Sequence, residues 1–383
     1  MSAALARLVL ETLRLAPAGG SADLAARWSG PDVAARAEAI GVWAAWEGGE
    51  QWLLRRLAET GALAGAPPAL VNSLRQATRE HAAAGMAVDD ETARVVRELA
   101  SLGVAAVLLK GPARRAAVAL YPMGAARRTS DVDVLVPTAD AERAWRRLAA
   151  LGYTPVYPFD PARAMPGESE LWGPSRHHLR PIRRPGGAAV ELHVSTSWEL
   201  PPATAWARHS GSGTTEVPWQ GLSVRVPSAT ELLWHGLTHA KPSEPGAWVL
   251  RFWLDAASLL AAPAVDWMTI AQRLGGAELP DRERAERWLA AAAQLAGVTL
   301  PTALAPRRPD PLLRLMAWRL TVFARAGMNA SWRSKLLDEA TRAELGVGVA
   351  PLIGGRSWPI VLRRRTASVS ARLLYGAWRA ATR

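Results

Sequence analysis

The chain has 383 residues, of which 49% are apolar and 21% are charged, a balance typical of a folded protein with room for two or three domains. It contains no cysteine, which excludes disulfides and thiolate zinc sites. The net charge is +12, but seven arginines and no carboxylate lie between residues 345 and 383, so much of the excess belongs to the C-terminal tail. Nucleic acid is therefore a conceivable partner but not the favoured one.

The N-terminal stretch MSAALARLVLETLRLAPAGG carries charged residues inside its apolar run, which is typical of an amphipathic helix rather than a signal peptide. No run reaches the ~18 uncharged apolar residues that a membrane span needs, so we expect no transmembrane segment and a cytoplasmic location. Residues 1–88 form an Ala/Leu-rich helical region broken at Gly and Pro. Asp89 and Asp90 are then expected to cap a new helix over residues 91–102, ended by Gly103.

Residues 89–227 mix helices with strands. The pattern predicts a buried strand over 104–109, a helix over 112–120, a strand over 131–136 and a helix over 139–151 capped by Gly152. Two β-hairpins follow, the first joining 177–184 to 188–195 and the second joining 215–219 to 222–227. Helical patterns return over 228–383. The fold class is therefore α+β, with a mixed sheet flanked by N-terminal and C-terminal helical regions.

Two aspartates stand one residue apart in the strand DVDVLV. Because side chains alternate along a strand, Asp131 and Asp133 project from the same face. Two like charges this close repel each other unless they share a cation, and Mg²⁺ is bound by such carboxylates together with substrate phosphates. Glu191 in AVELHV is a suitable third carboxylate on a neighbouring strand. Three carboxylates on adjacent strands can hold two metal ions.

A lysine-glycine step directly follows the preceding strand. Gly111 lets the backbone approach a phosphate, the expected helix start favours an anion, and Lys110 adds a positive charge. Arg127 and Arg128, just ahead of the aspartates, can neutralise more phosphate charge. The alternative interpretation is that Lys110 ends the strand and is exposed to solvent.

These motifs together resemble a known family. LLKGPA, YP, RRTSDVDVLV, GY and VELHV are similar to the polymerase-β-like nucleotidyltransferase superfamily, and more narrowly to its group of uncharacterised nucleotidyltransferases, in which lysine-glycine replaces the usual glycine-serine. HGLTHA, LRFWLDAASLL and VDWMTIAQRL resemble the helical segment of that group. The resemblance covers roughly residues 90–275.

The resemblance implies a mixed sheet, an NTP donor (ATP expected), two Mg²⁺ or Mn²⁺ ions, and transfer of a nucleotidyl group. By position, Asp131 and Asp133 match the metal pair and Glu191 the third carboxylate. Lys110 and Gly111 match the nucleotide loop, and Arg127 fits the family arginine better than Arg128 does. The acceptor stays open: a small molecule, a peptide natural product or a protein. Because the glycine-serine step is absent, we assign no residue of this sequence to the triphosphate contact that the serine usually makes.

Several residues keep alternative interpretations. His193 is a core histidine, a nucleotide contact or a metal neighbour. His177 and His178 begin a strand and are expected to face opposite sides, one of them toward the cleft. His235 and His239 lie four apart on a helix, but without Cys or an intervening Glu packing is favoured over zinc.

The C-terminal tail carries apolar residues at helical spacing among arginines, namely Val369, Leu373, Leu374 and Trp378. It predicts a packed helix with a basic face, or a surface for an acidic partner, a membrane or nucleic acid. Two functional alternatives to nucleotidyl transfer also follow from the sequence. The first is a catalytically inactive binding module for an acidic peptide or nucleic acid, and the second is an enzyme of the same fold that transfers the γ-phosphoryl group.

Overall fold

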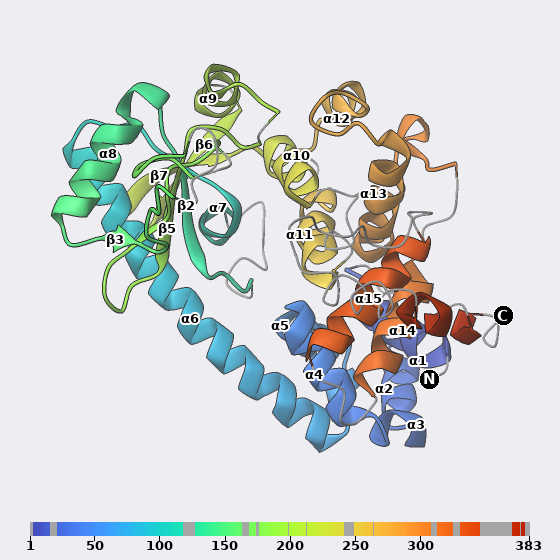
Figure 1. Ribbon diagram of the computed structural model, residues 1–383. Coiled ribbons are helices and arrows are strands. Elements are labelled where there is room, and N and C mark those ends of the chain that lie inside the picture. Colours follow the sequence, from blue (N-terminus) through green and yellow to red (C-terminus); the bar gives the residue numbers. More distant parts are fainter. Residues whose placement is uncertain are drawn as a thin grey trace. The chain divides into compact units, whose positions relative to one another are not determined.

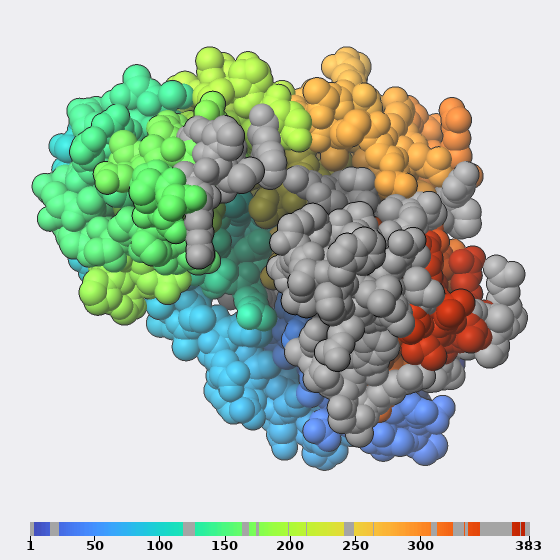
Figure 2. Space-filling view, viewed as in Figure 1, coloured from blue at the N-terminus to red at the C-terminus, as the bar shows by residue number. Residues whose placement is uncertain are grey.

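The computed structural model describes most of the chain, and Figures 1 and 2 colour the described residues from blue to red along the sequence. The chain forms two compact units that are interleaved along the sequence. The first unit comprises residues 1–77, 240–257 and 281–383, and the second comprises 78–239 and 258–280. The described residues are 3–15, 21–117, 127–162, 168–173, 176–197, 199–211, 213–240, 249–262, 264–307, 312–324, 330–344, 370–375 and 377–379.

The second unit is built on a mixed seven-stranded sheet with the strand order β3-β4-β5-β2-β1-β7-β6. The pairs β2–β5 and β1–β7 are parallel, and the other neighbours are antiparallel. The expected hairpins are confirmed as β4–β5 and β6–β7. The strands are β1 (Val107–Leu108), β2 (Asp131–Leu135), β3 (Thr154–Pro155), β4 (Ile182–Arg183), β5 (Ala189–His193), β6 (Thr214–Trp219) and β7 (Leu222–Pro227).

Helices cover both faces of this sheet, with α7 and α8 on opposite sides in Figure 1. Val107, Leu109 and Leu135 form a buried apolar cluster between the strands and α9, whose Trp206 packs against it. This packing fixes the ends of β1 and β2, where the polar candidate residues begin. The helices are α6 (Pro68–Ser101, from Thr78 onward in this unit), α7 (Lys110–Ala116), α8 (Thr138–Ala150), α9 (Pro202–Ser210), α10 (Ala229–Ala240) and α12 (Trp267–Arg273).

The helix before β1 differs from the prediction. Asp89 and Asp90 do not cap a new helix, because α6 runs without a break from Pro68 to Ser101. Asp89 is instead a buried anchor whose two carboxylate oxygens accept hydrogen bonds from Arg115 of α7 at 2.7 and 2.5 Å. The Asp89 side chain makes a tertiary contact instead of capping a helix, so its presence in the sequence does not mark a helix start. The predicted end at Gly103 is confirmed, with a φ of +69°.

The first unit is helical throughout its described residues. Trp28 and Trp52 donate their indole N–H groups to Thr12 and to the carbonyl of Leu13, both at 2.9 Å, which ties three helices together. The helices are α1 (Ala3–Leu13), α2 (Ser21–Trp28), α3 (Pro31–Ala34), α4 (Ala37–Glu47), α5 (Glu50–Glu59), α11 (Leu250–Leu260, up to Ala257 in this unit), α13 (Arg282–Ala296), α14 (Leu312–Phe323) and α15 (Ala330–Glu344), with short 3-10 turns at Ala62–Ala64 and Thr302–Leu304.

The C-terminal tail is described only in part. Residues 370–375 and 377–379 are helical, whereas 345–369, which include most of the predicted basic surface, lie outside the described residues. The predicted apolar face is wrong in detail: Tyr375 is buried, while Leu373 is 69% exposed. Tyr375 stacks with Trp378 and meets Trp318 of α14 edge-on, so the aromatic residues rather than the leucines anchor this helix.

No helix among the described residues has the length and apolar character that crossing a membrane requires. The division into regions 1–88, 89–227 and 228–383 follows the order of the sequence, whereas the compact units draw on distant segments. That division stays a prediction.

Candidate functional site

Two parallel strands carry the acidic residues of the candidate site. β2 pairs with β5 in a register that sets Asp133 opposite Glu191, Asp131 opposite Ala189 and Leu135 opposite His193. Because neighbouring residues in register project from the same face, Asp133 and Glu191 lie side by side. The expectation that Glu191 stands on a strand next to Asp133 is met in this geometry.

Asp133 is fully buried, and its two oxygens have different surroundings. Oδ1 lies 2.6 Å from the Lys110 ammonium and 2.8 Å from His193 Nε2. Oδ2 accepts no hydrogen bond from the described part of the chain. Burial alone would raise the pKa of Asp133, but the Lys110 charge and the His193 hydrogen bond outweigh it and hold that pKa well below its usual range. The carboxylate is therefore ionised, with one oxygen unsatisfied.

Glu191 and His193 complete this group. His193 Nε2 lies 3.3 Å from Glu191 Oε2 as well as facing Asp133, and the His193 ring is 1% exposed. Burial would raise the pKa of Glu191, yet the His193 hydrogen bond and Lys110 bring it below its usual value. Burial and Lys110 act to lower the pKa of His193, but its hydrogen bonds to both carboxylates raise it overall. His193 Nδ1 has no hydrogen-bond partner among the described residues.

Asp133, Glu191 and His193 could together hold a metal ion, since each offers a ligand atom and these atoms all lie within 4.8 Å of one another. Asp131 is not part of this group. It is only partly buried, and Ser130 Oγ lies 3.3 Å from its Oδ1. Burial and repulsion from Asp133 raise the pKa of Asp131. The group thus contains Asp133 and the predicted third carboxylate Glu191, with His193 in place of Asp131.

The lysine-glycine step lies beside these carboxylates. Lys110 begins α7 with a φ of +44°, a conformation that non-glycine residues rarely adopt. Besides Asp133, its ammonium lies 3.5 Å from Glu191 Oε2, so it is neither in open solvent nor directed away from the acidic group. Gly111 is packed so tightly that an added Cβ would lie 2.2 Å from Thr129 Oγ1 and 2.9 Å from the Arg127 guanidinium. No side chain other than hydrogen fits at position 111.

The two arginines before β2 differ in position. Arg127 donates to Thr129 Oγ1 at 2.8 Å and to the Arg128 carbonyl at 3.1 Å, which holds its guanidinium against Gly111. Arg128 is exposed. Only Arg127 therefore stands next to the lysine-glycine step, in agreement with its better fit to the family position.

Histidines from two further elements gather near the site. The rings of His177 and His178 are 4.5 Å apart and lie 5.6 and 5.3 Å from the His193 ring, so the expectation that they face opposite sides is wrong. His178 makes only an isolated bridge to His193, and without a regular strand the alternation of side chains does not apply. No spacing rule predicts this clustering of histidines from the sequence, in which the adjacent His177-His178 pair is the one visible signal.

His235 and His239 on α10 belong to the same neighbourhood. Their rings are 6.1 Å apart. His239 keeps access to solvent, yet desolvation by the surrounding protein and the Lys110 ammonium lower its pKa. A neutral imidazole on α10 thus lies within electrostatic reach of Lys110 and Asp133, a proximity that the helical spacing alone does not reveal.

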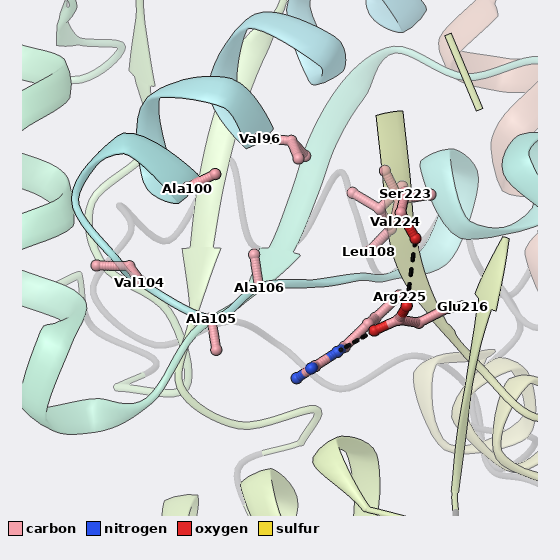
Figure 3. A pocket seen from close by; sticks show the side chains of 10 residues that line it. All are labelled: Val96, Ala100, Val104, Ala105, Ala106, Leu108, Glu216, Ser223, Val224 and Arg225. Carbon is pink, nitrogen blue, oxygen red and sulfur yellow. Dashed lines mark hydrogen bonds and ion pairs between the residues drawn. The ribbon is translucent and has the colours of Figure 1, made fainter. Parts of the chain in front are cut away.

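A separate cavity of about 270 Å³ lies in the same unit, between the end of α6, the segment leading into β1 and the β6–β7 hairpin (Figure 3). Small apolar residues such as Ala100 and Val104 line one side, and the ion pair between Arg225 and Glu216 lies on the other. None of the acidic or basic residues of the candidate site lines this cavity.

Fold and site together define an α/β protein whose mixed sheet presents two carboxylates and a histidine as a group that could hold a metal. Residues 35–293, more than half of the chain, match the family of uncharacterised nucleotidyltransferases, and the chain belongs to this family. The match begins before and ends after the segment in which the sequence motifs are visible. No curated protein is found that matches the chain.

Proposed function

We propose that this protein is a divalent-metal-dependent nucleotidyltransferase that moves a nucleoside monophosphate from an NTP, with ATP the expected donor, to an acceptor. The second unit would then be a polymerase-β-like core. The observation that carries the proposal is the group formed by Asp133, Glu191 and His193 on paired strands of a chain that belongs to a nucleotidyltransferase family. Because NTPs are abundant in the cytoplasm, we expect the reaction to take place there.

The residues fit a divalent cation. Asp133 is a buried, ionised carboxylate with an oxygen that no described group satisfies, and such an atom is costly unless a cation or another donor reaches it. Asp133 and Glu191 would be the principal ligands, with His193 and Asp131 as further donors. Mg²⁺ suits the carboxylates, whereas the imidazole favours Mn²⁺. A cation bound there would neutralise charge on the triphosphate and act as a Lewis acid at the phosphorus, and we propose two such ions.

The protein's own residues supply binding and proton transfer. Lys110 and Arg127 bring positive charge toward the triphosphate, and the close packing of Gly111 against Thr129 and Arg127 keeps Arg127 beside the lysine-glycine step. The acceptor oxygen attacks the α-phosphorus, forming a new P–O bond while the α–β phosphoanhydride bond breaks and pyrophosphate departs. Glu191, whose pKa is lowered so that it is ionised at neutral pH, would take the proton of the acceptor. Positioning and charge neutralisation supply most of the rate.

The test is incubation of the full chain with each labelled NTP in turn, Mg²⁺ or Mn²⁺, and cell extract, followed by mass spectrometry of labelled products. The proposal predicts a mass increase of one nucleoside monophosphate, and Asp131→Asn should abolish it in a protein that still folds. An increase of a single phosphoryl group would favour γ-phosphoryl transfer. Absence of any NTP-dependent product, with partner binding that persists in chelator, would favour the inactive binding module.

A further inference from the structure

The Lys110 ammonium lies among the atoms that would bind the metal. Its Nζ is 2.6 Å from Asp133 Oδ1 and 3.5 Å from Glu191 Oε2, and its side chain is 16% exposed. These two carboxylates supply two of the three ligands in the candidate metal group. The Lys110 ammonium offsets the negative charges of Asp133 and Glu191, which would otherwise repel each other, as a bound metal ion would.

The backbone supports this placement of Lys110. Its φ of +44° is unfavourable for a residue with a side chain, and such strain persists only where the surrounding structure enforces it. Leu109 donates its amide to the Asp133 carbonyl at 2.9 Å, and Gly111 is wedged against Thr129. The segment on both sides of Lys110 is therefore fixed, and the flexible part is the four-carbon stem of the lysine itself.

A divalent cation bound to Asp133 and Glu191 would lie within a few ångströms of the Lys110 ammonium. Charges of the same sign this close in a partly buried site repel strongly. Binding of a metal ion therefore favours movement of the Lys110 ammonium toward another anion. The triphosphate of the proposed donor is such an anion.

We propose that Lys110 is a positioning residue whose ammonium occupies the carboxylates in place of a metal ion. It weakens the binding of a divalent metal alone. When the metal binds together with a nucleoside triphosphate, the ammonium leaves the carboxylates and binds the triphosphate. This inference rests on the proposed function and specifies how its site is loaded. Metal and nucleotide thus bind with positive coupling, and Lys110 is the origin of that coupling.

Mn²⁺ binding to the full chain, measured by the electron paramagnetic resonance signal of the free ion, tests the proposal without turnover. The titration is run with and without an ATP analogue whose α–β bridge is a methylene group. Lys110→Met keeps the stem and removes the charge, so it should bind Mn²⁺ alone about tenfold more tightly than wild type. The analogue should then tighten Mn²⁺ binding strongly in wild type and about tenfold less in the variant.

Two further variants make the test specific. Arg127→Met removes a neighbouring positive charge that hydrogen-bonds to Thr129 and to the Arg128 carbonyl, and it should leave the affinity for Mn²⁺ alone unchanged within about twofold. Lys110→Arg restores a cation and should restore the weak binding of Mn²⁺ alone. If Lys110→Met does not fold, Lys110→Gln, whose amide can still donate to Asp133, takes its place.

Equal affinities of wild type and Lys110→Met for Mn²⁺ alone would overturn the inference, as would an equal effect of Arg127→Met. In both cases the proposed function stands, provided that Mn²⁺ and the analogue still bind together. If neither protein binds Mn²⁺ with or without the analogue, the metal site itself is refuted, and both proposals fall.

Discussion

Glu47 in the first unit and Asp133 in the second are both buried carboxylates, with 2% and 0% of the residue exposed. Glu47 uses both oxygens within the protein: Oε1 accepts from Arg319, and Oε2 accepts from the Leu250 amide at 2.8 Å. Asp133 leaves Oδ2 without a partner in the described chain and shares Oδ1 between Lys110 and His193. Glu47 thus has a protein donor on each of its oxygens, whereas among the described residues Asp133 has donors on Oδ1 alone.

Glu344 and Glu91 extend this comparison. Glu344 accepts from Tyr375 at 2.6 Å on one oxygen and from Arg314 at 2.8 Å on the other. Glu91 of α6 accepts from the Tyr153 hydroxyl and, at 2.8 Å, from Arg184. The second unit therefore holds a buried acid with donors on both oxygens and one with donors on a single oxygen, so the contrast does not depend on the unit.

The largest expected effect is functional. Asp133→Asn should lower nucleotidyl transfer by about a thousandfold, because the group loses the charge that every other member contacts. It should lower the free energy of unfolding less than Glu47→Gln does, since Lys110 keeps its contact with Glu191 and the change relieves repulsion with Glu191 and Asp131. The labelled-NTP assay and urea unfolding measure the two quantities. Asp140→Asn, which changes the same chemical group at a partly exposed position of α8, is the control, and a stable Asp133→Asn variant with full activity would contradict the comparison.

Glu47→Gln should show the opposite pattern. Loss of one partner leaves Arg319 buried without its counter-charge, and such a change costs about 3–5 kcal/mol. Urea unfolding should show this loss, while Glu38→Gln on the exposed side of α4 should change stability little. If Glu47→Gln is as stable as wild type, saturation of a buried acid is no guide to a structural role.

Gly111→Ala tests how closely the lysine-glycine step is built. The added methyl group would meet Thr129, which is 4% exposed and cannot easily move, so we expect a loss of about 1–3 kcal/mol in stability together with weaker NTP binding. Gly211→Ala is the matched control, since its nearest neighbour to an added Cβ is a carbonyl oxygen at 3.6 Å. Thermal unfolding and calorimetric titration with the ATP analogue measure the two effects.

The smallest effect is the pH dependence at Glu344. Burial raises the pKa of this carboxyl, but hydrogen bonds from Arg314 and Tyr375 outweigh it and bring the pKa below the ordinary value of 4.5. The carboxylate therefore contributes stability above that value, and the contribution is lost as the pH falls through the lowered pKa. Glu344→Gln should melt below wild type at neutral pH, and the gap should narrow in acid. A gap independent of pH would show that the charge contributes nothing.

The sequence predicted much of the sheet, including the two strands that carry Asp133 and Glu191. Alternation in DVDVLV and the hairpin around Pro185–Gly187 predicted β2, β4 and β5, and the parallel pairing of β2 with β5 brings Asp133 to Glu191. Family membership is confirmed for a longer part of the chain than the motifs cover. The roles assigned to Asp131, Glu191 and Arg127 stay predictions.

Other features depend on tertiary contacts that no local pattern encodes. Aspartate often caps the start of a helix, but Asp89 instead accepts a hydrogen bond from Arg115, 26 residues away. The sequence predicts that Lys110 faces phosphate, whereas in the structure its ammonium lies 2.6 Å from Asp133 Oδ1. The register between β2 and β5 brings His193 into the candidate metal group with Asp133. Each outcome follows from electrostatic neighbours far along the chain.

The strand order β3-β4-β5-β2-β1-β7-β6 leaves β3 and β6 as the outermost described strands. Each contains a proline, Pro155 in β3 and Pro218 in β6. Proline has no amide hydrogen, so both outer strands lack a donor in the row that another polypeptide would use to extend the sheet. Proteins use this device against self-association through exposed strands, and here it protects a sheet whose function depends on its centre.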